Sequence, residues 1–231
     1  MNAMKEQFLN GEIILIDKPL GWTSFQVVNK IRWLIRSTFG IKKIKVGHAG
    51  TLDPLASGLL ILCTGKMTKS IEQFMGQEKE YTGTFTLGAT TPSYDLETEI
   101  DHTFPTDHIT EELLQTTLDQ FVGTIDQYPP VFSALKKDGK RLYEFAREGV
   151  EVEIPTRKVN IRSFELTQKA IPKVDFKVIC SKGTYIRSLA NDYGKALNSG
   201  AHLSALRRTR IGKFNIEQAV SIEDFEKQIK K

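Results

Sequence analysis

The chain has 231 residues, of which 40% are hydrophobic and 26% charged, a composition typical of a folded protein rather than a disordered one. That length suits one large domain or two small ones. The longest apolar run, Leu59–Cys63, is far shorter than the roughly 20 residues that a membrane span needs. The first residues also lack the apolar stretch of a signal peptide, so we expect a cytoplasmic protein without membrane association.

The formal net charge of +4 is unevenly distributed along the chain. Residues 18–52 contain seven Lys and Arg and no Asp or Glu. Residues 181–213 contain seven Lys and Arg against Asp192 alone, whereas residues 80–135 contain ten acids and no Lys or Arg. This pattern predicts one basic and one acidic surface, as in proteins that bind polyanions. By itself it does not identify a nucleic acid as the partner.

The first half of the chain predicts strands around one long helix. Glu12–Asp17 is a short apolar run typical of a strand. After a Thr23/Ser24 cap, apolar residues recur at helical spacing until Gly40 stops the helix. Two further strands are predicted at Leu59–Leu62 and Tyr81–Leu87. The stretch 91–106, rich in Thr, Pro and Asp, predicts a long surface loop.

The second half mixes helices and strands without a regular strand–helix–strand rhythm. A helix is predicted from Thr110 through Phe121, closed by Gly123. The other predicted elements are the helices Leu142–Arg147, Thr184–Leu197 (capped by Thr184) and Ser221–Ile229, and the strands Val159–Leu166 and Val174–Cys180. The irregular order favours an α+β fold over a doubly wound one.

Metal sites and nucleotide cofactors find no support in the sequence. The four histidines and two cysteines lack the spacing of metal ligands, and Cys63 and Cys180 are best explained as buried thiols in a reducing compartment. Thr64, Gly65 and Lys66 resemble the end of a phosphate-binding loop, but Met67 follows where Ser or Thr would hold magnesium. We therefore expect no metal and no cofactor.

Two segments carry residues suited to chemistry. In residues 46–58, three glycines and Pro54 surround Asp53, which predicts a tight, exposed loop that a ligand can approach closely. The same pattern also suits an Asp that only stabilises a turn or caps a helix. In residues 180–189, Tyr185 and Arg187 fall in the first turn of a predicted helix, which is equally compatible with an ordinary amphipathic helix.

A family resemblance decides between these interpretations. The stretch GHAGTLDPLASGLL at 47–60 resembles the catalytic signature of the bacterial tRNA pseudouridine-55 synthases, the TruB family. Agreement continues in order through IDKPLGWTS (16–24), KEYTGTFTLGATTPSYD (79–95), PPVFSALKKDGKRLYEFAREG (129–149), CSKGTYIRSLANDYG (180–194) and LRRTRIGKF (206–214). The resemblance covers the chain from about residue 11 to 214.

The resemblance implies a role for each matching residue. Asp53 matches the catalytic nucleophile, Arg187 the arginine that pairs with it, and Tyr81 the tyrosine that stacks on the target base. The other implied site residues are His48, which fills the space left by the flipped base, Tyr185 and Leu206, which line the uracil pocket, Asp95 in a loop near the site, and Lys18 and Pro19 in a supporting loop.

The resemblance also implies the fold, organisation and substrate. We expect a pseudouridine-synthase-like α+β core, with a mixed, mostly antiparallel sheet flanked by helices. One catalytic domain would span residues 1–231, with a core at about 11–214 and a short tail at 215–231. The implied activity is conversion of uridine to pseudouridine in the T-loop of tRNA, at position 55. We expect a monomer that binds the T-arm without an obligate protein partner. The C-terminal RNA-binding domain of PUA type found in many members is expected to be absent.

Two other functions stay open at this point. One is the related synthase subunit of archaea and eukaryotes that depends on a guide RNA; it normally carries the PUA domain. The other is a chaperone that refolds tRNA without catalysis, which would not require the Asp53 carboxylate. The sequence is also compatible with attack by Asp53 at C1′, attack at C6, or proton abstraction.

Overall fold

The computed structural model describes residues 2–133, 135–137, 139–150 and 152–230. The chain divides into two compact units, which are described separately. Unit 1 comprises Met1–Tyr81 and Arg207–Lys231, and unit 2 comprises Thr82–Leu206. Two strands, β4 (Lys79–Leu87) and β12 (Ala201–Ile211), contribute residues to both units. The single-domain boundary over 1–231 stays a prediction.

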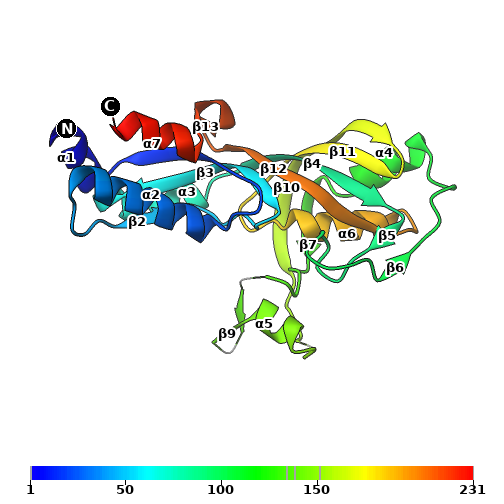
Figure 1. Cartoon of the computed structure of the whole chain (residues 1–231). Helices are drawn as coiled ribbons and strands as arrows, with labels where there is room; N and C mark the ends of the chain where they lie inside the picture. Colours follow the sequence, from blue (N-terminus) through cyan, green and yellow to red (C-terminus); the bar gives the residue numbers. More distant parts are fainter. Residues whose placement is uncertain (1, 134, 138, 151, 231) are drawn as a thin grey trace. The chain divides into compact units, whose positions relative to one another are not determined.

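Unit 1 combines a small antiparallel sheet with helices (Figure 1). Its elements are α1 (Asn2–Asn10), β1 (Ile13–Lys18), α2 (Ser24–Phe39), β2 (Val46–His48), β3 (Ala56–Thr64), the 3-10 helix η1 (Gly65–Ser70), α3 (Ile71–Met75), β13 (Phe214–Asn215), the 3-10 helix η2 (Ile216–Gln218) and α7 (Ile222–Lys230). Strand β3 pairs with β1 from Ile13↔Cys63 to Lys18↔Gly58, and also pairs with β2.

Strand β3 is buried on both faces, which explains its continuous apolar run Leu59–Cys63. Leu60 and Leu62 belong to a core cluster with the apolar faces of α2 and α7. Leu59 and Ile61, which point the opposite way, belong to a second cluster. Residues 215–230, expected as a tail, include α7, which contributes three buried side chains to the first cluster.

Helix α2 confirms the boundaries predicted for it. Thr23 caps its first turn: the Thr23 hydroxyl accepts from the Gln26 amide, and the Gln26 side chain accepts from the Thr23 amide. Gly40 ends the helix in the left-handed conformation, with φ of 59°. The helix therefore starts and stops where local chemistry dictates, and it holds Ser24 at its first position.

Unit 2 is built on an antiparallel sheet in which neighbouring strands follow the order β12-β4-β11-β10-β7. Its other elements are β5 (Ala89–Thr90), β6 (His102–Thr103), α4 (Glu111–Asp119), β7 (Gly123–Gln127), β8 (Lys136–Lys137), β9 (Lys140–Arg141), α5 (Leu142–Arg147), β10 (Arg157–Ala170), β11 (Lys173–Cys180) and α6 (Ile186–Ala196). The fold is α+β with a mostly antiparallel sheet, as predicted.

An aromatic cluster fixes α6 against the sheet of unit 2. Phe85 of β4 and Phe176 of β11 stack with ring centroids 4.2 Å apart. Tyr193 of α6 contacts Phe85 and Phe164, and its buried hydroxyl donates to the Leu114 carbonyl of α4 at 2.7 Å. Burial raises the pKa of this hydroxyl far above its ordinary value. The position of α6, and thus of Arg187, depends on this packing.

Two expectations for unit 2 are wrong. Tyr185, not Thr184, occupies the cap position of α6, and the Thr184 hydroxyl donates to the Ser181 carbonyl instead. Residues 91–106 are not simply a surface loop, because Ser93 and Asp95 are buried. Their polarity is compensated internally by hydrogen bonds and an ion pair, so composition alone misrepresents their location.

We expect Gly58→Ala to lower the free energy of unfolding by about 2–4 kcal/mol. Gly58 has φ of 104°, and a Cβ there would lie 2.3 Å from the Arg208 carbonyl oxygen. Gly21→Ala is the matched control, because Gly21 has φ of 82° with open space around the added Cβ. It should cost about 1 kcal/mol. Urea denaturation of both variants measures the difference; equal losses would contradict a steric cost at Gly58.

Candidate active site

Asp53 lies in the loop between β2 and β3, and the backbone around it is anchored on both sides. The buried Ser24 hydroxyl accepts from the Leu52 amide at 2.9 Å and donates to the Leu52 carbonyl at 3.1 Å. On the other side, the Gly21 amide donates to the Pro54 carbonyl at 2.8 Å. Asp53 itself is half-buried. The backbone on both sides of the Asp53 carboxylate is therefore restrained.

The side chain of Arg208, on β12, is hydrogen-bonded to this loop and to β3. It is fully buried, Nε donates to the Leu59 carbonyl at 2.8 Å, and Nη2 donates to the Gly50 carbonyl at 3.0 Å. The guanidinium thus joins the loop to the strand that follows it. In the sequence, Arg208 is one of several cations in the basic segment 181–213. No local signal distinguishes an inward-pointing arginine from its neighbours Arg207 and Arg210.

Lys18 is a second buried cation of the same unit. Nζ donates to the Pro19 carbonyl at 3.0 Å and to the Trp22 carbonyl at 2.6 Å. The pKa of Lys18 is lowered to about 8: burial is the largest cause and the positive charge of Arg208 adds to it, while the negative charge of Asp53 acts in the opposite direction. Lys18 therefore holds the loop that follows β1, and it is electrostatically coupled to Asp53. Its role in supporting the site stays a prediction.

His48 ends strand β2 and is half-buried. Its Nδ1 is buried and has no hydrogen-bond partner among the described residues. Burial lowers the pKa of His48 below its ordinary value, and the positive charge of Arg208 lowers it further. The ring is therefore neutral near pH 7, which suits packing against a base more than binding a phosphate.

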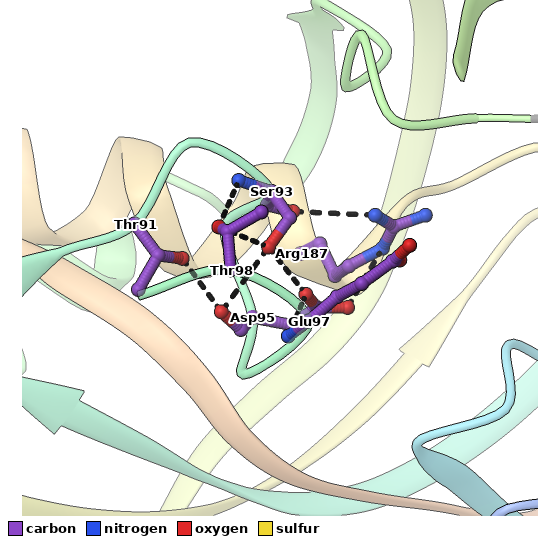
Figure 2. A network of polar contacts seen from close by, with 6 residues as sticks. All are labelled: Thr91, Ser93, Asp95, Glu97, Thr98 and Arg187. Carbon is purple, nitrogen blue, oxygen red and sulfur yellow. Dashed lines mark hydrogen bonds and ion pairs between the residues drawn. The ribbon is translucent and has the colours of Figure 1, made fainter. Parts of the chain in front are cut away.

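Arg187 and Asp95 form a buried ion pair in unit 2 (Figure 2). Nε of Arg187 lies 3.6 Å from Oδ2 of Asp95, and Nη1 donates to the Ser93 carbonyl at 3.2 Å. The exposed fraction is 3% for Arg187 and 4% for Asp95. A buried charge is tolerated when it is paired and hydrogen-bonded, so each residue fixes the other.

The second oxygen of Asp95 is held by its own loop. Oδ1 accepts from the Ser93 hydroxyl at 2.6 Å and from the Glu97 amide at 3.0 Å. The Thr91 hydroxyl donates to the Asp95 carbonyl, and Thr98 lies within hydrogen-bond distance of the Ser93 hydroxyl. Figure 2 shows the Ser93, Asp95 and Thr98 side chains of this loop close to one another. The network predetermines where the Arg187 guanidinium can lie.

Tyr185 is positioned by a residue that the sequence did not reveal. The buried Gln127 side chain accepts from the Tyr185 amide at 2.7 Å and donates to the Tyr185 carbonyl at 3.1 Å. The guanidinium carbon of Arg157 lies 4.9 Å from the centroid of the Tyr185 ring. The start of α6 is thereby tied to β7 and β10. A lone Gln at the end of a strand carries no sequence signal for this role.

The remaining predicted residues belong to different units. Tyr81 lies on β4 in unit 1 and is buried, with 8% exposed. Leu206 lies on β12 in unit 2 and is half-buried. The structure thus brings Lys18, His48, Asp53 and Tyr81 into one unit. Asp95, Tyr185, Arg187 and Leu206 belong to the other. The pairing of Arg187 with Asp53 stays a prediction, whereas its pairing with Asp95 is observed.

The described residues show no metal site, no membrane-spanning helix and no disulfide. Among these residues, no three His, Cys, Asp or Glu side chains are grouped in a way that could hold a metal ion. No described helix is both long enough and apolar enough to span a membrane. Cys63 and Cys180 are both buried, as predicted, and neither forms a disulfide within the part of the chain that is described. Burial raises the pKa of the Cys63 thiol to about 11.

Comparison with known sequences identifies the class and then the family. Residues 36–186 match the family described as "TruB family pseudouridylate synthase (N terminal domain)". Residues 187–231 match the "tRNA pseudouridylate synthase B C-terminal domain". The protein is therefore a pseudouridylate synthase. The chain belongs to the TruB family.

Relatives similar to the chain over almost its whole length carry the name tRNA pseudouridine synthase B. The protein from Flavobacterium johnsoniae is 61% identical, over 97% of this chain and 98% of its own. The protein from Phocaeicola vulgatus is 58% identical, over 94% of this chain and 93% of its own.

Solved structures agree with the fold. The chain is similar to one in a Cbf5-Nop10-Gar1 complex, with a TM-score of 0.73 and 30% identity over 97% of this chain. A second match, with a TM-score of 0.69 and 28% identity, is an H/ACA RNP bound to a substrate RNA containing 2′-deoxyuridine. The present chain spans only 56% and 55% of the length of those two chains.

Stability should depend on Lys18 at alkaline pH. The pKa of about 8 in the folded state lies below the ordinary 10.5, so the unfolded chain binds more protons between these two pH values. The free energy of unfolding of the wild type, minus that of Lys18→Gln, should therefore increase as the pH rises from 8 to 10.5. Denaturant titrations at pH 7.5, 8.5 and 9.5 measure this difference. A constant difference would show that Lys18 is not desolvated.

Proposed function

We propose that the chain converts uridine to pseudouridine in the T-loop of tRNA, at position 55. Membership of the TruB family and the relatives named tRNA pseudouridine synthase B support this activity. The structural observation that carries the proposal is Asp53 on a loop anchored through Ser24 and Arg208, with the Lys18 charge coupled to it. A fixed carboxylate beside buried cations suits nucleophilic chemistry on a nucleoside.

The proposed reaction is an isomerisation that exchanges one glycosidic bond for another. The N1–C1′ bond breaks, the uracil turns, and a C5–C1′ bond forms. C5 loses its proton and N1 gains one, so no electrons are transferred and no redox cofactor is required. Asp53 acts as the nucleophile that gives a covalent intermediate, and its departure regenerates the carboxylate. Attack at C1′ and attack at C6 both use the same carboxylate.

The other site residues are proposed to bind and orient the target uridine. A stacked T-loop uridine must leave the loop before Asp53 can reach it. His48, neutral and lacking a hydrogen-bond partner at Nδ1, fills the vacated space. Tyr81 stacks on the flipped base, while Tyr185 and Leu206 line its pocket. Arg187, oriented by Asp95, pairs with Asp53.

We further propose that the protein acts as a monomer in the cytoplasm, with the T-arm of tRNA as its partner and no obligate protein partner. The Cbf5-Nop10-Gar1 structure is that of a multiprotein complex, and that assembly is a property of Cbf5. The competing function, refolding of tRNA without catalysis, would not need Asp53. The two functions are separated by one substitution.

Asp53→Asn should fold and bind tRNA with nearly unchanged affinity but lose essentially all isomerase activity. The amide preserves the shape of the side chain and cannot act as the nucleophile. Mass-based mapping of pseudouridine in tRNA treated with purified protein measures activity, and thermal denaturation controls for folding. Substantial turnover by the variant would remove Asp53 from its assigned role. Wild-type protein that binds tRNA but forms no pseudouridine would favour the chaperone function.

Tyr81→Leu should reduce turnover far more than tRNA affinity. Base–aromatic stacking is worth roughly 1–3 kcal/mol per base, whereas most RNA affinity comes from phosphate contacts. Tyr81→Phe keeps the ring and separates stacking from any role of the hydroxyl in removing the C5 proton. Single-turnover kinetics on saturating tRNA distinguish these effects. If Leu weakened binding by orders of magnitude while turnover of bound RNA persisted, Tyr81 would be a docking residue instead.

A further inference from the structure

A concave basic surface lies in unit 1, beside the strand that leads into the Asp53 loop. The cavity has a volume of about 510 Å³ and lies among α2, the loop that follows it, β2 and η1. Its charged lining residues are Arg32, Arg36, Lys42, Lys43 and Lys45, which we call the basic pocket. Among the described residues that line it, none is an Asp or Glu. The pocket therefore concentrates positive charge in a hollow.

The two arginines of the basic pocket are held by neutral partners. Nη2 of Arg32 donates to the Val46 carbonyl at 3.2 Å, and Nη1 donates to the Asn29 side chain at 3.1 Å. Nε of Arg36 donates to the Ile41 carbonyl at 3.3 Å. These bonds orient both guanidinium groups without neutralising them. Their charge thus remains available to an anion.

The three lysines are exposed and form no ion pair with any residue that the structure describes. A cation near the C-terminal end of α2 also stabilises the helix dipole, which gives a structural reason for one or two of these charges. It does not explain five cations lining one hollow. Lys45 in particular immediately precedes β2, beyond the last turn of the helix.

The number of cations indicates an RNA strand rather than a single small anion. One phosphate is saturated by two or three donors, whereas five cations suit successive phosphates along a backbone.

We propose that the basic pocket binds successive backbone phosphates of the RNA substrate. Gly47, which lines the pocket, directly precedes His48 on β2, so a strand held there continues toward the loop of Asp53. This inference rests on the proposed function only in taking RNA as the substrate. It assigns to α2 and the following loop a role in holding RNA that is separate from the chemistry.

The test compares two triple variants that remove the same charge. Lys42→Gln/Lys43→Gln/Lys45→Gln removes the exposed lysines of the pocket and leaves both arginines, whose bonds support the backbone. The control, Lys158→Gln/Lys169→Gln/Lys173→Gln, removes three exposed lysines of β10 and β11 in unit 2. The affinity of each variant for tRNA is measured at several salt concentrations, together with the turnover of saturating tRNA.

We expect the pocket variant to bind tRNA about tenfold to a hundredfold more weakly than the control at roughly 0.1 M salt. The log–log salt dependence should become shallower by about 2–3, from about 0.7–0.9 per lost phosphate contact. Turnover at saturating tRNA should match the wild type. Equal affinity and salt dependence in the two variants would overturn the proposal.

Two further outcomes distinguish this inference from a small-anion site and from the proposed function. Inorganic phosphate provides the small-anion probe: if the pocket variant loses phosphate binding but keeps the wild-type salt dependence for tRNA, the pocket is a small-anion site and the proposal is wrong. If wild-type protein forms no pseudouridine, yet the pocket variant shows the expected loss of tRNA affinity, the proposed function fails while the RNA-backbone site stands.

Discussion

The buried guanidinium of Arg208 is the constraint on which the Asp53 loop depends. By donating to the carbonyls of Gly50 and Leu59, it fixes one side of the loop to β3, while Ser24 fixes Leu52 from the other direction. Its positive charge also lowers the pKa of Lys18 and of His48. One side chain thus holds the loop in shape and adds to the effect of burial, which is the larger cause of both pKa shifts.

The sequence predicts those elements in which the apolar spacing and the residues at the ends indicate the same boundaries. Helix α2 is predicted well because Thr23 and Gly40 define its ends chemically, and β3 because a strand buried on both faces must be apolar throughout. Strand β12 was missed, since LRRTR shows neither a clean alternation nor an apolar run. The composition of residues 91–106 wrongly predicts a surface loop, because it does not show that the polar groups of Thr91, Ser93 and Asp95 satisfy one another in a buried position.

The sequence indicates candidate site residues, but it does not indicate the residues that support them. Asp53 follows from a loop of glycines and proline together with a family signature, and that signature extends to the matching residues of unit 2. Gln127 and Ser24 act through hydrogen bonds to backbone atoms remote in the sequence, Tyr185 and Leu52. Such contacts exist only after folding, so neither the spacing nor the composition of the sequence predicts them. The Asp95–Arg187 pair likewise appears only when β4, its following loop and α6 are in place.

The cations of the two basic segments have different roles in the folded protein. In the segment 181–213, Arg207 pairs with Asp17, Arg210 pairs with Glu78, and Arg208 is buried against carbonyls. These cations stabilise the protein itself, so their presence in the sequence overstates the charge offered to a ligand. In the segment 18–52, Lys18 is also buried, but five other cations line a hollow without a carboxylate. The guanidinium groups of Arg32 and Arg36 are held by neutral groups, and the three lysines form no ion pair with any described residue, so the positive charge of that hollow is available to a polyanion.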